Sequence, residues 1–418
     1  MPKLRFLITA PFYYPCPDIM AVSNHVGALA EALASRGHEV HIVHSLDVSV
    51  RLCRFYPTTS GWKDMVSKEQ REHPGVFIHT LRSPLRVIDP IIAYLFGSSP
   101  YVNRQFRSIL KEVKPDIVHY FSPKFFGHHI LRKHGDYLSI YTASDFWLIC
   151  PRNYLLKNGQ QDCDKKTCFS CAIRSRKPPE LGRYTRSFRR AVDDIDLILV
   201  ESTLVKEKLG AELNKRIECI PHYLPYKKQE IKPSGYSNYF LFSGQLELSK
   251  GILNLLEAFR RYRDKINARL IITGRGRLEN HIKKFIAKNN MQDKVMLLGW
   301  VDRELLWSLY KDALALVVPS IALDPGPMVV VDALSVGTPV IASDRSGYGW
   351  DIIRKIDKGL VFNNGDVEGL AEILATFHSE NYPPEELKTI CERQFSLQSY
   401  VSRYLDILEE MKGHLAGA

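Results

Sequence analysis

Residues 320–343 have the sequence SIALDPGPMVVVDALSVGTPVIAS, which runs from one apolar segment into another. Pro327 suits the first position of a helix and Gly337 suits its end, so the stretch predicts a strand, a turn, a helix and a second strand. Asp324 lies just before that helix, and Asp332 lies inside it. The free N–H groups of a first helical turn suit a phosphate or an anionic sugar oxygen. The two acids can accept hydrogen bonds from sugar or ribose hydroxyls.

Apolar strand patterns alternate with amphipathic helix patterns along the whole chain. The chain has 418 residues, of which 45% are hydrophobic and 25% are charged, so it is long enough for two globular domains. Such alternation is typical of a parallel sheet covered by helices on both faces. We expect strands at residues 4–10, 38–45, 115–121, 138–144 and 196–202, and again at 239–246, 268–276, 294–301 and 314–320.

The predicted fold class is α/β, with two doubly wound Rossmann-like domains facing a central cleft. We expect a first domain over residues 1–228, a linker over 229–235, a second domain over 236–395 and a final amphipathic helix over 396–418. Ligands of such sheets bind beyond the carboxyl ends of the strands. Both domains can therefore contribute to one central site.

The sequence contains no signal typical of targeting or membrane spanning. Its first ten residues, MPKLRFLITA, favour a β-strand over a signal peptide. No uninterrupted apolar stretch reaches the roughly 18 residues that a spanning helix needs. We therefore expect a cytoplasmic protein whose eight cysteines do not form a disulfide framework.

The net charge of the chain is +11, and its basic residues are unevenly distributed. They are densest in residues 174–190, which hold seven basic residues and one acid. Such a stretch is either a solvated face or a surface that meets anionic lipid or an anionic acceptor. The second interpretation predicts a peripheral protein at the inner face of the membrane. No zinc finger or RNP-type module is visible, so we expect no nucleic-acid partner.

Several motifs follow one another in an order that resembles a known family. They are GHEVHIVHS (37–45), PDIVHYF (115–121), SGQLELSKGILNLLEAF (243–259), IITGRG (271–276), LLGWV (297–301), the stretch at 320–343, and KGLVFNNGDVEGLAEIL (358–374). As an ordered set they resemble retaining glycosyltransferase family 4, whose fold is GT-B. The resemblance implies transfer of a hexosyl group from a nucleoside diphosphate sugar to a saccharide or lipid-linked acceptor, with retention at the anomeric carbon.

The resemblance also implies roles for individual residues. Asp324 would be the catalytic residue that contacts the hydroxyls of the donor sugar, and Asp332 would bind the ribose. No metal is needed at the diphosphate, because a lysine and helix N-termini supply the positive field. The other donor-binding residues that it implies are Gly244, Gln245 and Lys250 for the diphosphate, Gly299 and Trp300 near the base, and the backbone of Gly326, Pro327 and Met328 for sugar and phosphate.

Each of these residues also has a purely structural interpretation. Asp324 could make an Asx turn before a helix, and Asp332 could be a solvated helix position. Lys250 could be a residue of a turn without a role in binding. Gly244 is typical of a backbone turn, because an isolated Gly-x-Gly is a weak signal.

The chain departs from the residues usual in the family. Aspartate is shorter than glutamate by one carbon, about 1.5 Å, and a misplacement of about 1 Å can lower a rate on the order of a hundredfold. The alternative function is therefore a catalytically weak or inactive paralogue that binds a nucleotide sugar and acts as a partner or regulator. The departures are Met20 and Ala21 for a glycine pair, Phe121 and Ser144 for histidines, Gln245 for an arginine, and Asp324 and Asp332 for glutamates.

Two residues of the first half are candidates for the acceptor side of the cleft. His25 lies at the start of the first expected helix, which begins at residue 24 and faces the cleft in this topology. Asp145 stands where the family commonly has a His-Asp pair.

Four cysteines lie within an insertion over residues 150–180. Cys150, Cys163, Cys168 and Cys171 have 12, 4 and 2 residues between them, and four thiolates can close a tetrahedral zinc site. An iron–sulfur cluster is a second interpretation, and reduced loop cysteines or a pair of disulfides are a third. The DFWLICP motif before this cluster also resembles a subgroup of the same family. A metal here would be structural rather than catalytic.

Overall fold

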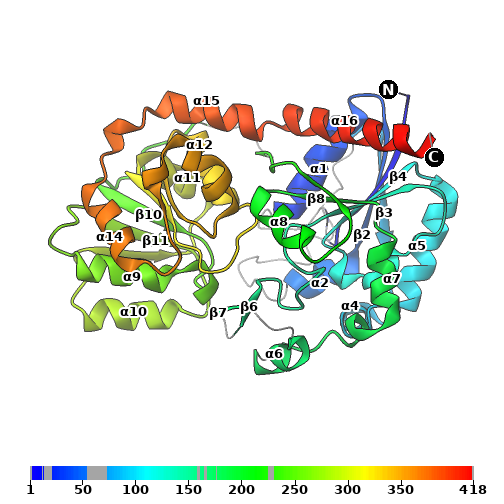
Figure 1. Ribbon diagram of the computed structural model, residues 1–418, viewed down its shortest axis with the longest axis horizontal. Coiled ribbons are helices and arrows are strands. Elements are labelled where there is room, and N and C mark those ends of the chain that lie inside the picture. The colour runs from blue at the N-terminus through cyan, green and yellow to red at the C-terminus, as the bar shows by residue number, and fades with distance from the viewer. Residues whose placement is uncertain are drawn as a thin grey trace.

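The computed structural model describes residues 2–11, 13, 21–53, 73–157, 161–163, 167–175, 177–224 and 230–416. They form two domains that lie side by side, each a parallel sheet with helices on its faces (Figure 1). Two Rossmann-like domains are what the alternating pattern predicts.

The first domain is built on a seven-stranded parallel sheet with the order β3-β2-β1-β4-β5-β8-β9. Five strands confirm the expected ones, whereas β3 and β9, at the two edges of the sheet, were not predicted. The buried strands are runs of Val, Ile and Leu because both of their faces are covered. The bounds are β1 (Arg5–Thr9), β2 (Glu39–Ser45), β3 (Val76–Leu81), β4 (Ile117–Phe121), β5 (Leu138–Thr142), β8 (Leu197–Val200) and β9 (Arg216–Cys219).

Helices cover both faces of this sheet, and the insertion adds a short antiparallel hairpin and one helix. The first helix begins three residues before its expected start, and the chain turns after it at Gly37, whose φ is 87°. The elements are α1 (Ala21–Ala34), α2 (Leu46–Cys53), α4 (Asp89–Phe96), α5 (Pro100–Val113), β6 (Leu156–Lys157), β7 (Gln161–Asp162), α6 (Cys168–Arg174), α7 (Arg186–Asp193) and α8 (Thr203–Gly210).

The second domain has a six-stranded parallel sheet with the order β12-β11-β10-β13-β14-β15. The opening stretch forms β13, a loop, α12 and β14, as predicted. One detail differs: Pro327 is the N-cap with ψ 111°, so the helix starts at Met328. The strands are β10 (Tyr239–Ser243), β11 (Arg269–Thr273), β12 (Val295–Gly299), β13 (Ala315–Val318), β14 (Val340–Ser343) and β15 (Val361–Phe362), and the helices are α9 (Ile252–Arg261), α10 (Glu279–Lys288), α11 (Arg303–Asp312), α12 (Met328–Ser335), α13 (Arg354–Ile356), α14 (Val367–Thr376) and α15 (Pro384–Phe395).

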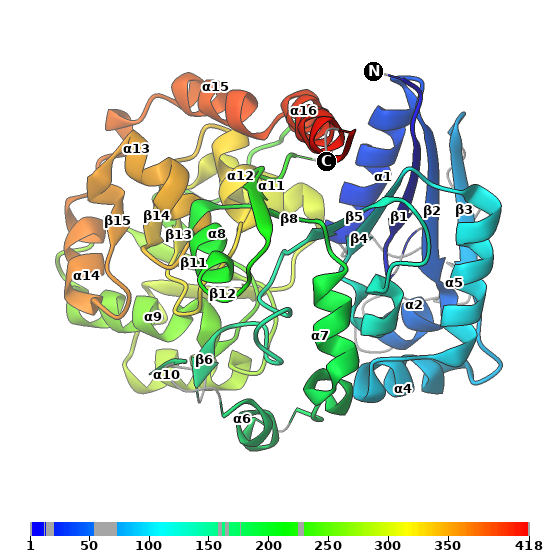
Figure 2. The same cartoon turned by 45° about the vertical axis from the view of Figure 1, so that its right-hand side comes forward.

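The last helix, α16 (Leu397–Ala416), leaves the second domain and packs on the first (Figures 1 and 2). Tyr404 of this helix is fully buried, with its ring 6.2 Å from that of Phe6 and its hydroxyl 3.1 Å from His119 Nδ1. Between the domains, residues 230–238 contain neither helix nor strand. The rest of the expected linker, residue 229, lies outside the described residues.

Candidate functional site

The cleft lies beyond the carboxyl ends of both sheets. Strand order reverses between β1 and β4 in the first sheet and between β10 and β13 in the second, and doubly wound folds bind ligands at such points. The segments after these strands line two adjoining cavities of about 210 and 150 Å³. Ser144, Asp324 and Pro325 line both of them.

The first cavity holds the lysine and the second holds the histidines. Two larger hollows, of about 580 and 650 Å³, are lined by the first domain alone. The cleft is the stronger candidate because both domains contribute to it. Its remaining lining residues are Asp145, Asn153, Tyr154, Ser249, Lys250, Ala322 and Leu323 in the first cavity, and Val22, His25, Phe121, Glu201, His222, Gly326 and Met328 in the second.

Lys250 and Asp324 form an ion pair in this cleft. Lys250 Nζ donates a hydrogen bond of 2.6 Å to Asp324 Oδ2. Burial alone would lower the pKa of Lys250, but the charge of Asp324 and this hydrogen bond outweigh it and raise the pKa. The lysine is therefore a fixed positive charge at the carboxyl end of β10.

A tight backbone crossing holds Lys250 in place. Gly251 follows it with φ 71°, a left-handed conformation, and a Cβ there would lie only 1.6 Å from the carbonyl oxygen of Pro319. Only glycine fits between the β10 and β13 loops. The crossing brings together two residues that are 74 positions apart in the sequence.

The loop before α12 is fixed to both domains. The Asp324 N–H donates to the carbonyl of Arg345, and the Gly347 N–H donates to the carbonyl of Asp324, at 2.9 and 2.8 Å. A Cβ on Gly326 would lie 2.8 Å from the Tyr348 hydroxyl and 2.9 Å from Glu201 Cβ. The loop thus passes between the second domain and the end of β8 with no room for a side chain.

Asp332 lies on the same helix, outside the residues that line the two cavities. Its Oδ1 is buried and has no hydrogen-bond partner in the described part of the chain. Burial raises the pKa of Asp332 to about 7, although the charge of Arg303 lowers it. A buried carboxylate oxygen without a donor is unfavourable in its charged form, which agrees with the raised pKa.

The remaining predicted donor residues lie at the ends of β10 and β12. Gln245 is exposed and, like Gly244, is not among the residues that line the cavities. Gly299 has φ 73° and accepts a hydrogen bond of 2.7 Å from the Gly274 N–H. Trp300 is 47% exposed, and the Arg275 guanidinium lies 5.9 Å from its ring centroid. The Trp300 ring could lie against an aromatic base. Arg275 was not among the residues predicted from the sequence.

His25 lines the second cavity, and its assignment to the acceptor side stays a prediction. Its ring stacks on Tyr223 with centroids 3.9 Å apart, and its Nε2 is buried with no hydrogen-bond partner within the described residues. Burial, followed by the charges of His222 and His119, holds the pKa of His25 well below its usual value. His25 is therefore neutral at physiological pH.

Glu201 and His222 line the same cavity as His25 and were not predicted. His222 Nε2 lies 2.5 Å from Glu201 Oε1, and Glu201 is 3% exposed. The His222 ring centroid is 4.4 Å from that of His25. Glu201 is the first charged residue after the apolar run of β8 and lies at the carboxyl end of that strand. This position is the sequence feature from which Glu201 could have been predicted.

Asp145 lines the first cavity, but both of its carboxylate oxygens hold the neighbouring loop. Oδ1 accepts a hydrogen bond of 2.8 Å from the Trp147 N–H, and Oδ2 accepts one of 2.6 Å from Asn153 Nδ2. Burial raises the pKa of Asp145 even though the bond from Trp147 lowers it. Its contacts are those of a residue that positions Asn153 and Tyr154 beside the cleft.

Each half of the chain matches the model of a known protein family. The family model for Glycosyltransferase Family 4 matches residues 22–224, and the model for Glycosyl transferases group 1 matches residues 226–393. The chain carries these two glycosyltransferase domains. The resemblance to this enzyme family is thereby confirmed at the level of its domains.

Solved structures of similar fold span nearly the whole chain. Sucrose-phosphate synthase (tll1590) from Thermosynechococcus elongatus has a TM-score of 0.69 at 17% identity, covering 99% of this chain and 100% of that one. Anabaena Alr3699/HepE in complex with UDP has a TM-score of 0.61 at 13% identity, covering 98% and 100%. At such identities the likeness concerns the fold, and it confirms the GT-B class.

Sequence relatives match over a shorter part of these domains. The uncharacterized glycosyltransferase MJ1607 of Methanocaldococcus jannaschii is 35% identical over 107 residues, 26% of this chain and 27% of that protein. The match thus spans about a quarter of the curated relative's own length. No helix in the described ranges has the length and apolar character needed to cross a membrane.

Two of the residues that depart from the family pattern lie at the cleft between the domains. Phe121 and Ser144 both line cavities there, so the positions at which the family has histidines face the site. Met20 lies outside the described residues, and Ala21 is the first residue of α1.

The four cysteines of the insertion differ in exposure. Cys150 is buried, Cys163 is exposed, and the four form no disulfide in the part of the chain that is described. Burial, followed by the other three thiols, raises the pKa of Cys163. Within the described residues no group of three or more ligating side chains has a geometry that could hold a metal ion. The zinc site therefore stays a prediction.

Proposed function

We propose that this chain is a retaining hexosyltransferase that uses a nucleoside diphosphate sugar. The observation that carries the proposal is the Lys250–Asp324 ion pair at the meeting point of both domains. In this proposal the lysine would bind the diphosphate and the aspartate would bind the sugar of the donor. The group 1 and family 4 domains support the same reaction class.

The donor would bind along the carboxyl ends of β10, β13 and β12. Lys250 has three N–H donors, so it can keep its bond to Asp324 while it binds the diphosphate. The N-terminal turn of α12, from Met328, has no side-chain cap, so its first backbone N–H groups would be available to the donor. Asp332 Oδ1 would accept from a ribose hydroxyl, and Trp300 would lie against the base.

The proposed transfer then needs no separate catalytic acid or base. A hydroxyl oxygen of the acceptor bonds to the anomeric carbon, and the bond from that carbon to the diphosphate breaks. The electron pair goes to the leaving diphosphate, which also takes the hydroxyl proton. Lys250 stabilises the negative charge that develops on the diphosphate, and such preorganised charge acts most strongly in a cleft with little water.

The acceptor would enter from the side of the first domain. His25, Glu201 and His222 surround the second cavity, and both Glu201 and His222 are polar groups able to bind a saccharide hydroxyl. A saccharide or lipid-linked acceptor fits this polar, partly aromatic lining. No nucleic-acid partner is proposed.

The first experiment is a thermal-shift panel of uridine, guanosine and adenosine diphosphate sugars. UDP sugars come first because the similar HepE structure is a complex with UDP. A ligand that binds only the folded chain, present at a hundred times its Kd, should raise Tm by about 3 °C. No shift with any nucleotide sugar would contradict the proposal.

The second candidate is a paralogue that binds the nucleotide sugar but does not transfer it. The observation in its favour is that both family glutamates are aspartates, Asp324 and Asp332, and that Asp324 is already engaged by Lys250. Such a protein would show the thermal shift and no release of nucleoside diphosphate.

The protonation of Asp332 should contribute to the pH dependence of the stability of the folded chain. Its pKa is about 7 in the folded chain and about 4 in an unfolded one, so the folded state binds the extra proton between these values. Stability from this group is therefore present at pH 4 and is lost as the pH rises to 7. As the pH rises from 4 to 7, the Tm of the Asp332→Asn variant should therefore rise relative to the Tm of the unaltered protein. Melting temperatures of the variant and the unaltered protein that change in parallel over pH 4–7 would count against this assignment.

Asp332→Asn should also raise the apparent KM for the donor and change kcat little.

We also propose that the cysteine cluster binds one structural zinc through Cys150, Cys163, Cys168 and Cys171. Four thiols are a donor set that suits zinc, and thiolates must be deprotonated, so acidification should release the metal. Elemental analysis of protein purified without chelator should give about one zinc per chain. Iron with visible absorption would favour a cluster instead, and four titratable thiols without metal would overturn both.

A further inference from the structure

The insertion places an exposed aromatic side chain in the cleft. Tyr154 is 43% exposed and lines the first cavity together with Lys250 and Asp324. Of the twelve large apolar side chains exposed in the described part of the chain, it is the one that lines either cavity of the cleft. Partial burial raises the pKa of the Tyr154 phenol, and the charge of Lys250 opposes this rise. A neutral aromatic ring therefore lies within electrostatic reach of the ion pair.

The two residues that flank Tyr154 both have left-handed backbone conformations. The φ of Asn153 is 71° and that of Leu155 is 52°. Such a conformation is unfavourable for a residue with a Cβ, and more so for leucine than for asparagine. Tyr154 is exposed between these two less exposed neighbours. Strained backbone persists only where the surrounding structure holds it, and it is concentrated at ligand and active sites.

Contacts on both sides of Tyr154 hold this strained turn. Asn153 Nδ2 donates a hydrogen bond of 2.6 Å to Asp145 Oδ2. Leu155 packs against the core of the first domain, and its carbonyl accepts a hydrogen bond of 2.9 Å from the Cys163 N–H. The Tyr154 hydroxyl itself makes no hydrogen bond within the described residues. The position of the ring is therefore fixed by its neighbours, which leaves the hydroxyl and the exposed part of the ring available to a ligand.

The same insertion also contacts the second domain. Asp162 of the β6–β7 hairpin pairs with the Arg345 guanidinium at 2.8 Å, and this hairpin lies next to the second domain in both ribbon views (Figures 1 and 2). The carbonyl of Arg345 accepts the hydrogen bond of 2.9 Å from the Asp324 N–H. One residue thus links the insertion to the loop that carries Asp324, so Tyr154 and Asp324 keep a fixed relation across the cleft.

We propose that Tyr154 selects the acceptor by packing its ring against one face of a pyranose ring of a saccharide. The C–H groups on a pyranose face are apolar and suit the negative face of an aromatic ring, whereas the hydroxyls around the pyranose need polar partners. The first cavity offers both kinds of contact. Its polar groups come from residues 144–145 and 153 of the first domain and from residues 249–250 and 324 of the second.

The assignment to the acceptor rests on the proposed function, in which the donor lies along the strand ends of the second domain. The wall of the first cavity that the first domain supplies, residues 144–145 and 153–154, is then left for the acceptor. Because the reacting hydroxyl must reach the sugar beside Asp324, the part of the acceptor that Tyr154 contacts is a sugar ring, whatever is attached further away.

The test measures the binding of the methyl glycosides of glucose, galactose, mannose and N-acetylglucosamine by saturation-transfer NMR. The full chain is first saturated with a ring-fluorinated analogue of its nucleotide sugar, which occupies the donor site and transfers slowly because fluorine destabilises positive charge on the sugar ring. At least one glycoside should bind, with the strongest saturation on the C–H protons of one ring face. Tyr154→Ala should weaken its affinity about tenfold. Tyr154→Phe keeps the ring and should stay within about threefold.

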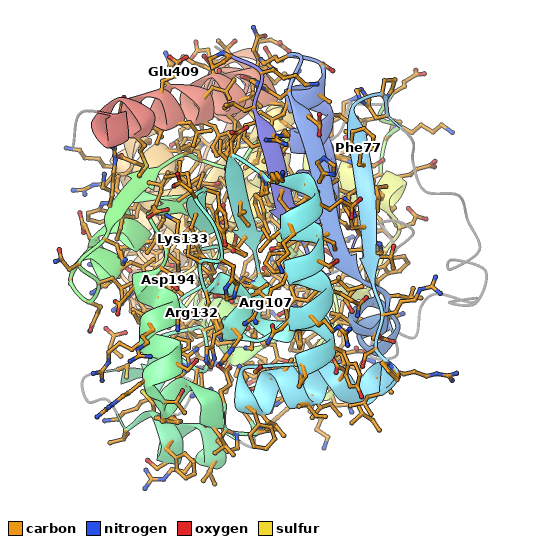
Figure 3. All side chains as sticks on the ribbon, turned by 90° about the vertical axis from the view of Figure 1, so that its right-hand side faces the viewer. Phe77, Arg107, Arg132, Lys133, Asp194 and Glu409 are labelled. Carbon is orange, nitrogen blue, oxygen red and sulfur yellow. The ribbon has the colours of Figure 1, made fainter. Side chains whose placement is uncertain are left out.

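Tyr101 provides the matched control, because it is 42% exposed on α5 and lines neither cavity of the cleft. Figure 3 shows Arg107 of the same helix on the side of the first domain that faces away from the second domain. Tyr101→Ala should bind the glycoside as the unaltered chain does. All three tyrosine variants should keep the Tm shift with the donor.

Several results would overturn the inference. They are the absence of glycoside binding to the unaltered chain, an unchanged affinity in Tyr154→Ala, and a loss in Tyr101→Ala as large as that in Tyr154→Ala. A donor Tm shift that disappears in Tyr154→Ala would also overturn it, because the ring would then belong to the donor site. The proposed function fails in a different way, through the absence of any Tm shift when the unaltered chain is mixed with nucleotide sugars.

Discussion

Asp324→Asn should lower kcat on the order of a hundredfold, with a much smaller change in the KM for the donor. The substitution keeps the shape of the side chain but removes the charge that holds Lys250 Nζ at 2.6 Å. Both the orientation of the lysine and the contact to the reacting sugar would be lost. Interactions that strengthen in the transition state act on the rate rather than on binding. Steady-state kinetics with the donor found by thermal shift are the measurement.

Two variants serve as controls for this result. Ser320→Ala removes the weaker 3.3 Å contact to Asp324 without altering charge, and Asp293→Asn removes an exposed carboxylate that pairs with Arg263 away from the cleft. Both should retain kcat within a few-fold. If Asp324→Asn turns over normally, the catalytic role of the loop before α12 is wrong.

Lys250→Ala should weaken the binding of a nucleoside diphosphate by about 10- to 150-fold, which corresponds to the 1.5–3 kcal/mol of a charged hydrogen bond. The free sugar should bind both proteins equally, because it carries no diphosphate. Titration calorimetry measures both affinities directly.

The matched control for the lysine is Lys284→Ala, since Lys284 is an exposed lysine on α10, outside the two cavities of the cleft. It should leave the nucleotide affinity unchanged. The Lys250→Ala variant leaves Asp324 without its partner, so its melting curve must be recorded as well. Unchanged nucleotide affinity in a folded Lys250→Ala protein would remove the lysine from the donor site.

The central strands could be predicted because their apolar runs reflect burial on both faces, as in β1 and β8. The edge strands β3 and β9 could not. Phe77 in β3 is 50% exposed, and β9 contains Arg216 and Glu218, which pair with each other at 3.1 Å on the surface. An edge strand is shielded on fewer sides, so its composition differs less from that of a loop.

The candidate site was predictable only in part for a related reason. Asp324, Lys250 and His25 could be named from local motifs, but their mutual arrangement depends on contacts between distant segments. Glu201 and His222 belong to different segments around β9, and only the folded chain brings the two side chains to 2.5 Å.

The most direct test of the central claim is transfer itself. The chain is incubated with the nucleotide sugar that raises its Tm, labelled in the sugar, and with lipid and oligosaccharide extracts as acceptors. Release of nucleoside diphosphate and incorporation of label are followed together. The account predicts stoichiometric release and incorporation and a product with the anomeric configuration of the donor. In Asp324→Asn, release and incorporation should both be slower on the order of a hundredfold. A donor that stays bound and intact, or a product of inverted configuration, would contradict it.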